Sequence, residues 1–179
     1  MTRSVCVVIT ARASYARIKT LLIAIRERSD LELQLVVAGS ALLGRYGSVI
    51  DVIQKDGFEI NAEVYMVVEG GNLITSAKST GMAIIELAPV FERLKPSIVI
   101  TVADRYETIA TAIASTYLNI PVAHVQGGEV TGSIDEKVRH AVTKLSTIHF
   151  VSTQIARERV IKMGELPEYV FFTGCPSID

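Results

Sequence analysis

The stretch SVCVVITARASYARIKTLLIAIRERSDLELQLVVAG, residues 4–39, contains two apolar runs rich in β-branched residues, with a helical pattern between them. Residues 4–10 and 31–39 have the composition of buried strands, and apolar positions recur at helical spacing in the segment that joins them. A strand, a helix and a second strand form a βαβ unit, in which the two strands lie parallel and the crossover is right-handed. This unit predicts an α/β fold.

Five further runs along the chain also have the composition of strands: residues 61–68, 97–102, 121–125, 148–152 and 169–174. Longer segments with helical periodicity separate most of them, as in residues 84–94. This alternation predicts a doubly wound, mainly parallel, Rossmann-like sheet with helices on both faces. Because no repeat, low-complexity segment or linker interrupts the chain, residues 1–179 are expected to form a single domain.

Composition excludes several classes of function. Apolar residues make up 49% of the chain, and Lys plus Arg (18) balance Asp plus Glu (19), so there is no basic field for nucleic acid. No apolar run approaches the roughly 18 residues of a membrane span, and no signal-peptide pattern is present, so we expect a cytoplasmic protein without a membrane partner. Cys6 and Cys175 lack neighbouring ligands at metal-binding spacing, so we expect reduced thiols and no metal site.

The first loop after a strand argues against a dinucleotide cofactor. A nicotinamide or flavin domain needs G-x-G-x-x-G at this place, whereas TARASYARI, residues 10–18, contains no glycine. Neither a phosphate-binding P-loop nor a G-x-S-x-G nucleophile elbow occurs elsewhere. We therefore expect no redox cofactor.

Asp104 lies where a strand ends, and two interpretations of it are compatible. With Glu107 three residues later it fits a capping box that would begin the helix through Tyr117. As a carboxylate at the carboxyl end of a parallel strand, it would also point into the expected binding crevice.

The stretch HVQGGEVTGSIDEKVRH, residues 124–140, concentrates ionisable groups after another strand. The pair Gly127-Gly128 permits a tight turn, and Ser133 with Glu136 forms a capping box that begins a helix. Four apolar side chains of this helix are expected to face the sheet: Ile134, Val138, Ala141 and Leu145.

A solvated helix start would explain Asp135 or Glu136 singly, because acids complement the helix dipole. It explains less well why five ionisable residues gather at the crevice end of adjacent elements: Glu129, Asp135, Glu136, Arg139 and His140. Clustered carboxylates raise one another's pKa and can supply both a proton acceptor and a proton donor. The cluster therefore favours an acid/base enzyme.

These blocks resemble the UDP-N-acetylglucosamine 2-epimerase family, especially the hydrolysing branch that feeds sialic and related nonulosonic acid synthesis. The resemblance covers essentially the whole chain, and the block over residues 127–153 is long enough to be specific. The matching pieces are the first loop with Arg12, GSALLGRYG (39–47), RLKPSIVITVADR (93–105), GGEVTGSIDEKVRHAVTKLSTIHFVST (127–153) and TGCPSID (173–179).

The resemblance implies a two-domain, glycosyltransferase-B-like fold in which this chain supplies the first domain and a UDP-binding domain follows. The chain is then expected to be a fragment that is inactive alone. Such enzymes eliminate UDP from the sugar to leave a 2-acetamidoglucal and then add water, with inversion at C2 and without a cofactor. The resemblance also implies a homo-oligomer, either a dimer or a tetramer.

Site residues follow from the matching positions. The resemblance assigns catalysis to Asp104 and Asp135, with Glu129 or Glu136 as possible further acids. It assigns substrate binding to the following residues, with Arg12 directed toward the diphosphate: Arg12, Ser14, Gly39, Gln126, Gly127, Arg139 and His140.

Three positions depart from the family pattern. Gln126 stands where relatives often have a glutamate, and an amide cannot accept a proton as a carboxylate does; Glu129 is the nearest replacement. Ser14 and Ala41 stand where relatives commonly have Asp and His. A different sugar, such as a UDP-linked 2,4-diacetamido-6-deoxy hexose, would account for these changes.

Two other classes of function stay open at the level of sequence. A glycosyltransferase of the same architecture would transfer the sugar to an acceptor. A non-catalytic sugar-nucleotide sensor would bind the ligand without turnover, and Gln126 is the main support for it.

Overall fold

The computed structural model describes residues 2–47, 49–103 and 105–176. The expected strands form one sheet in the order β3-β2-β1-β4-β5-β6-β7, with every neighbouring pair parallel. This confirms the doubly wound α/β prediction. The strands are β1 (Arg3–Ile9), β2 (Leu31–Ala38), β3 (Ala62–Val64), β4 (Ile98–Val102), β5 (Val122–Val125), β6 (Ile148–Val151) and β7 (Val170–Phe172).

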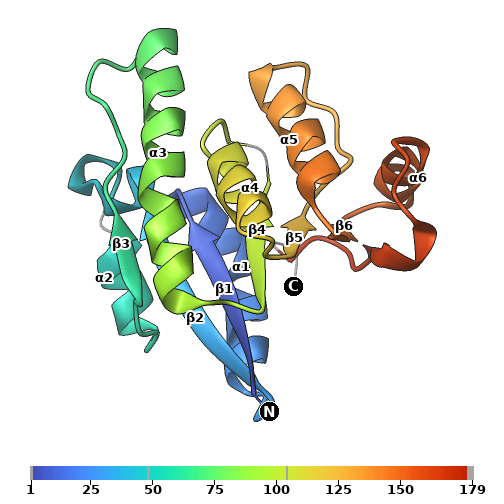
Figure 1. The fold of residues 1–179 in the computed structure, drawn as a ribbon, viewed down its shortest axis with the longest axis horizontal. Coiled ribbons are helices and arrows are strands. Elements are labelled where there is room, and N and C mark those ends of the chain that lie inside the picture. Colours follow the sequence, from blue (N-terminus) through green and yellow to red (C-terminus); the bar gives the residue numbers. More distant parts are fainter. Residues whose placement is uncertain (1, 48, 104, 177–179) are drawn as a thin grey trace.

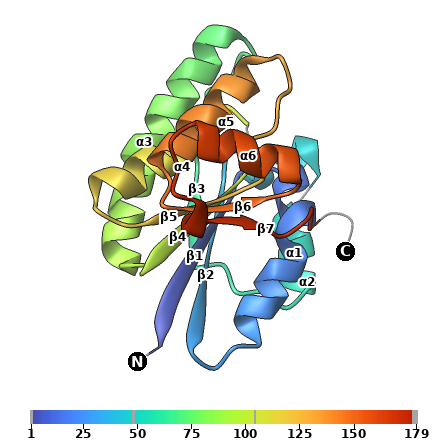
Figure 2. The same cartoon turned by 90° about the vertical axis from the view of Figure 1, so that its right-hand side faces the viewer.

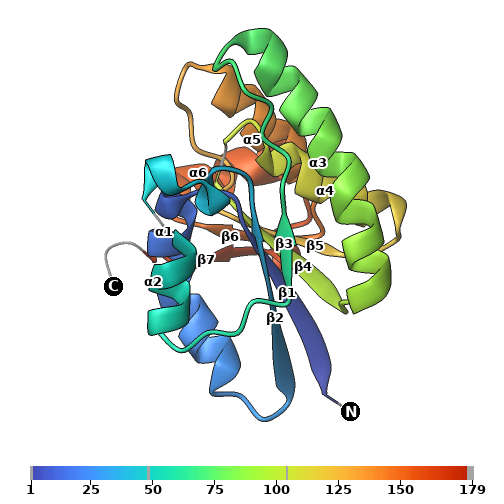
Figure 3. The same cartoon turned by 90° about the vertical axis from the view of Figure 1, so that its left-hand side faces the viewer.

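Helices cover both faces of the sheet (Figures 1, 2 and 3). Helices α1 (Arg12–Arg26) and α2 (Val49–Lys55) lie on one face. Helices α3 (Leu73–Leu94), α4 (Thr108–Tyr117) and α5 (Ile134–Leu145) lie on the other, and α6 (Gln154–Lys162) packs on β6 and β7. Right-handed crossovers explain this division, because the chain winds from β1 toward β3 and then in the opposite direction from β4 toward β7. No helix in the described ranges is long and apolar enough to cross a membrane.

The central strand β1 contributes to the cores on both sides. Val5, Val7 and Ile9 pack in the cluster that contains α1 and α2, whereas Cys6 and Val8 pack with α3. Successive side chains of a strand point to opposite faces, so a sheet covered on both sides needs apolar residues at every position. Each such burial stabilises the fold by roughly 1.5–3 kcal/mol.

Two element boundaries differ from the sequence prediction by three residues or more. Strand β3 spans only Ala62–Val64 rather than residues 61–68, because it is an edge strand that pairs with β2 alone. Helix α4 begins at Thr108 with Glu107 as its N-cap, and Glu107 makes no capping hydrogen bond through its side chain. The predicted capping box would have begun this helix directly after Asp104. The helix start is therefore wrong by three residues, and Asp104 itself lies outside the described residues.

Ser133 caps the start of α5 as predicted, but Glu136 has other hydrogen-bond partners than those of the predicted capping box. Ser133 is the N-cap and accepts a hydrogen bond from the Asp135 N–H (3.2 Å). Glu136 reaches back to the N–H groups of Thr131 and Gly132 instead of closing the box on Ser133.

One apolar position of α5 was predicted wrongly. Ile134 is 60% exposed, because the first turn of α5 extends beyond the carboxyl edge of the sheet (Figure 1). Val138 and Val142, one and two turns further on, are the side chains that pack in the core next to α4.

Candidate functional site

The winding direction of the sheet reverses between β1 and β4. In an open parallel sheet, ligands bind outside the carboxyl ends of the strands at such a switch point, because the loops there diverge to opposite faces. The loops that meet at this edge follow β1, β2, β4 and β5. They contain most of the residues that the sequence predicts to be functional.

A cavity of about 240 Å³ lies at this edge. It is lined by residues that follow β1, β2, β3 and β4, namely Ala11, Arg12, Ala13, Ser40, Val67, Arg105 and Tyr106. Among the described residues that line it, the charged ones are the two arginines. Arg12 opens α1, whose first turn contains no acidic side chain, so the helix dipole adds to this positive potential. Guanidinium groups next to a helix N-terminus favour an anionic ligand such as a phosphate.

The sequence predicted Arg12 at this cavity but missed Arg105 and its partner Glu107. Arg105 Nε donates to Glu107 Oε1 over 2.8 Å, and the Glu107 side chain is only 1% exposed. Burial raises the pKa of Glu107, while Arg105 opposes that shift. Sequence reasoning used Glu107 only as half of a helix cap; the signal that could have found the pair is the spacing Arg-x-Glu directly after a strand.

The turn at Gly39 is docked on the end of β1. Ser40 Oγ and the Ala41 N–H both donate to Thr10 O, at 3.0 and 3.2 Å. Gly39 has φ of +61°, and a Cβ there would lie 2.8 Å from Met66 Cε and 3.2 Å from Thr10 O. Only glycine fits this close approach. Gly39 therefore shapes the cavity wall, and Ser40 is the residue of the turn that lines it.

Strained backbone marks the ends of the neighbouring strands β4 and β5. Ala103 has φ of +62° and Gln126 has φ of +66°, although neither is a glycine. Residues held in the left-handed region cost free energy and cluster at functional sites. Gln126 is buried, and its Nε2 donates to Cys175 Sγ over 3.1 Å. The amide at this family position therefore contacts the chain segment that follows β7.

A buried histidine supports this strained edge. The Nε2 of His124 lies 2.9 Å from Ala103 O, and its Nδ1 lies 3.2 Å from Thr143 Oγ1. Burial lowers the pKa of His124 to about 4, so the ring is neutral near pH 7. Because a carbonyl can only accept, Nε2 carries the proton and donates to Ala103 O, and Nδ1 is the unprotonated nitrogen. The Thr143 hydroxyl beside Nδ1 donates to Arg139 O over 3.0 Å. Gly127 lies against this ring, since a Cβ there would be 3.0 Å from Nδ1.

The ionisable residues of α5 have different environments. Asp135 is partly buried and close enough to Arg105 and Glu107 to raise the pKa of both. The pKa of Glu136 is lowered by hydrogen bonds from Gly132 and Thr131, so this carboxylate has a local role in holding the loop. The structure thus brings Asp135, rather than Glu136, toward the cavity.

The other predicted residues lie near this edge with differing exposure. Arg139 is 3% exposed and forms part of the packed side of α5, whereas His140 Nε2 lies 3.9 Å from Glu136 Oε1. Glu129 is partly buried in the loop before α5, and Ser14 is buried within α1. Asp104, the main catalytic prediction, falls outside the described residues.

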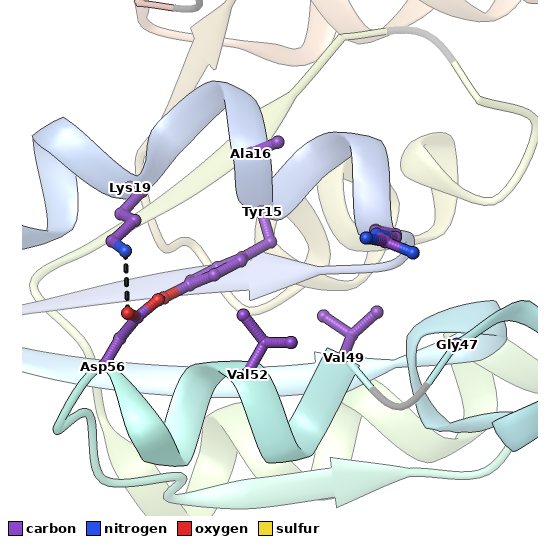
Figure 4. A pocket seen from close by; sticks show the side chains of 8 residues that line it. Tyr15, Ala16, Lys19, Gly47, Val49, Val52 and Asp56 are labelled. Carbon is purple, nitrogen blue, oxygen red and sulfur yellow. Dashed lines mark hydrogen bonds and ion pairs between the residues drawn. The ribbon is translucent and has the colours of Figure 1, made fainter.

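A second cavity, of about 420 Å³, lies between α1 and α2 and shares Arg12 with the first (Figure 4). Val49 and Val52 point toward α1, and the ring of Tyr15 lies between the helices. The Tyr15 hydroxyl donates to Asp56 Oδ2 over 2.5 Å, and Lys19 Nζ lies 2.7 Å from Asp56 Oδ1. Lys19 and Tyr15 are thus paired with Asp56 at one end of this cavity. Arg12 lines both cavities, so it lies where the second cavity adjoins the crevice.

A family model described as UDP-N-acetylglucosamine 2-epimerase matches residues 23–179. The chain belongs to this family. The match includes the turn at Gly39, the loop after β4 and the whole β5–α5 segment, which are the parts that build the cavity edge. The family resemblance expected from the sequence is thereby confirmed.

Curated relatives agree with this assignment. The chain is 37% identical over 179 residues to a hydrolysing UDP-N,N'-diacetylbacillosamine 2-epimerase of Legionella pneumophila, covering 100% of this chain and 48% of the relative. It is 34% identical over 173 residues to a hydrolysing GDP/UDP-N,N'-diacetylbacillosamine 2-epimerase of Campylobacter jejuni, covering 96% and 45%. The chain therefore spans about half the length of these relatives.

Solved structures show the same fold. A crystal structure of UDP-N-acetylglucosamine 2-epimerase superposes with a TM-score of 0.89 at 21% identity, over 99% of this chain and 49% of that one. The enzyme from Neisseria meningitidis bound to UDP-GlcNAc gives 0.85 at 19% identity, over 98% and 47%. The chain thus has the Rossmann-like, glycosyltransferase-B-like fold of the matching part of these structures.

Proposed function

We propose that the protein is a hydrolysing UDP-N-acetylglucosamine 2-epimerase, which converts its substrate to N-acetylmannosamine and UDP. The observation that carries the proposal is the cavity at the switch point, where Arg12 and Arg105 supply positive charge and Asp135 lies close by. A diphosphate and an acid/base group are the two requirements of this reaction. Family membership supports the same assignment.

The reaction has two steps. A carboxylate removes the proton from C2 while the C1–O bond breaks, which releases UDP and leaves a C1=C2 double bond. Water then adds its hydroxyl to C1, and an acid delivers a proton to the opposite face of C2. Two carboxylates on opposite sides of the sugar, or one carboxylate and a proton relay, suffice for this chemistry.

The residues divide between binding and proton transfer. We assign Arg12 to the diphosphate and the proton transfers to Asp104 and Asp135, with Glu129 as the further acid. Glu136 is the weaker choice for catalysis, because Glu136 Oε2 already accepts from two backbone N–H groups. The proposed binding surface further includes Ser14, Gly39, Gln126, Gly127, Arg139 and His140.

We propose that this chain forms the first of two domains of the enzyme. Its coverage of about half of each relative supports this arrangement. The crevice would then close between the carboxyl edge of this sheet and a second domain that holds UDP. On this proposal, residues 1–179 alone do not turn over substrate.

A second candidate substrate is UDP-N,N'-diacetylbacillosamine. The names of the relatives that are 37% and 34% identical support it, as does Gln126 at a position where the resemblance to the family leads us to expect glutamate. An additional acetamido group on the sugar would need different polar contacts from a hydroxyl. Both candidates share the same elimination and hydration chemistry.

We further propose that the enzyme self-associates through the face formed by α3, α4 and α5. An apolar groove of about 480 Å³ lies there, and Leu73, Ile74 and Ile134 beside it are largely exposed. Exposed apolar patches of this kind mark association sites. A second copy of the chain would bury them.

The proposal is tested by incubating the full-length protein with each UDP-sugar separately and following the phosphorus NMR signals. Release of free UDP without an added acceptor, together with the 2-epimeric sugar, is the expected result. Release only in the presence of an acceptor would identify a glycosyltransferase. Binding without release of UDP from either sugar would identify a sensor and contradict the proposal.

A further inference from the structure

Glu107 is a buried carboxylate without an assigned role. It lies beside the turn at Gly39, where its Oε1 would be 4.0 Å from a Cβ at that position. Oε1 accepts from Arg105 Nε, whereas Oε2 is buried and has no hydrogen-bond partner among the described residues. A carboxylate in this state costs stability, because one of its oxygens has given up water without replacement. Its presence is not explained by the stability of the fold.

The partner of Glu107 belongs to the cavity. The Arg105 side chain is 45% exposed, lines the cavity with Arg12, and has its guanidinium carbon 5.9 Å from the centre of the Tyr106 ring. Glu107 engages the Nε–H of Arg105, and no hydrogen bond within residues 2–47, 49–103 and 105–176 uses its terminal nitrogens, which can therefore meet a ligand. An arginine fixed in this way loses less rotamer freedom when it binds an anion.

We infer that Glu107 is a positioning residue for the proposed UDP-sugar site, acting through Arg105. The carboxylate fixes the guanidinium so that its terminal N–H groups face the cavity and meet a phosphate-bearing ligand in a preorganised orientation. This inference rests on the proposed function for the identity of the ligand. It predicts that replacing Glu107 with leucine weakens ligand binding without lowering the stability of the fold.

Two substitutions separate charge from hydrogen bonding. Glu107→Gln removes the charge but keeps an oxygen that can accept from Arg105 Nε, and Glu107→Leu removes both. In the full-length protein, Glu107→Leu should raise the Kd for UDP about tenfold or more, which corresponds to the smallest free-energy losses seen when a charge-assisted hydrogen bond is removed. Glu107→Gln should raise the Kd less, because the hydrogen bond to Arg105 can still form. The urea midpoint of Glu107→Leu should equal or exceed that of the wild type, because a buried unpaired oxygen has been removed. Glu107→Gln removes the buried charge but keeps a buried polar atom, so its midpoint should lie closer to that of the wild type.

A double-mutant cycle tests whether Glu107 acts through Arg105. Adding Glu107→Leu to an Arg105→Ala background should leave the Kd for UDP unchanged within about twofold, because the group to be positioned is gone. Effects that add in the double variant would overturn the inference. So would wild-type affinity in Glu107→Leu, or a loss of affinity that merely parallels a loss of stability.

Glu165→Gln is the matched control. Glu165 pairs with Lys144 over 2.5 Å near the amino end of β6, away from the cavity, so UDP affinity should not change. Inorganic diphosphate serves as a second probe that is independent of the sugar. Wild-type protein that binds UDP without turnover would contradict the proposed function alone, whereas wild-type protein that binds neither probe would overturn this inference as well.

Discussion

At the scale of single residues, the site is marked by side chains and backbone that stability alone does not favour. Ala103 and Gln126 occupy the left-handed region without being glycine, and Glu107 is buried with one oxygen that finds no hydrogen-bond partner in the described part of the chain. Each of these features lies just after β4 or β5, and Glu107 contacts Arg105, which lines the cavity. Strained backbone and a buried charge at this edge favour a functional role for it.

Replacing Asp104 with Asn tests the main catalytic assignment. An amide cannot exchange a proton at C2, so turnover of the full-length enzyme should fall by about 10²–10⁴ while the unfolding midpoint stays the same. Asp30→Asn is the control, because Asp30 pairs with Arg28 just before β2, at the opposite edge of the sheet. Retained turnover in Asp104→Asn would remove Asp104 from the mechanism.

His124 makes stability depend on pH in a defined direction. Its pKa is about 4 in the folded protein, below the ordinary 6.5, so the unfolded chain binds the proton more readily. The stability that neutral His124 contributes to the folded protein is therefore fully present above about pH 6.5 and is lost as the pH falls toward 4. Between about pH 7 and pH 4.5 the free energy of unfolding should fall by roughly 2–3 kcal/mol through this group.

Urea unfolding at the two pH values measures this effect. Carboxylates also titrate in this range, so the comparison is between the wild type and His124→Gln, which should lack this component. His140→Gln is the control, because His140 is partly exposed and should leave most of the dependence in place. Equal pH dependence in the wild type and His124→Gln would refute the assignment.

At the scale of elements, every strand could be predicted, because runs of β-branched residues are what a sheet covered on both faces requires. Element ends were harder. The α4 start was misplaced because Asp104 and Glu107 have the spacing of a capping box, a pattern that local sequence cannot distinguish from an irregular loop. Ile134 fitted the helical period but projects beyond the sheet edge, and periodicity does not reveal where a partner surface ends.

The loop between β5 and α5 should tolerate change at one glycine and not at another. Gly128 has φ of +79° and a Cβ there would lie 2.5 Å from Ala156 O, whereas Gly132 has φ of +72° with nothing within 4 Å. Gly128→Ala should destabilise by about 3 kcal/mol or more, and Gly132→Ala by about 1 kcal/mol. Thermal unfolding compares the stabilities of the two variants. Equal losses of stability would contradict the close contact between Gly128 and Ala156 of α6.

At the scale of the whole molecule, the topology positions the site. A switch point between β1 and β4 places loops from distant parts of the sequence around one cavity, and Arg12 and Arg105 meet there although 93 positions separate them. The sequence located Arg12 and the acids of α5 because they belong to recognisable motifs. It missed Arg105 and Glu107 because their importance depends on burial and on a shared cavity, which no local pattern contains.

Self-association is the prediction at this scale. Charges introduced by Ile74→Lys and Ile134→Lys should convert an oligomer to a monomer in sedimentation velocity, because they would be desolvated between α3 and α5 of two copies. Ile155→Lys is the control, since Ile155 is also exposed but lies on α6. A wild-type protein that sediments as a monomer, or an unchanged oligomer in the double variant, would contradict the proposed interface.

The central claim is acid/base chemistry at C2 of a UDP-linked 2-acetamido sugar. The most direct measurement is a proton NMR time course in deuterated water, with the full-length protein and either UDP-N-acetylglucosamine or UDP-N,N'-diacetylbacillosamine. We predict free UDP and a 2-epimeric sugar that carries deuterium at C2 for at least one substrate. Release of a sugar that retains its C2 proton and configuration, or no reaction with either substrate, would contradict the account.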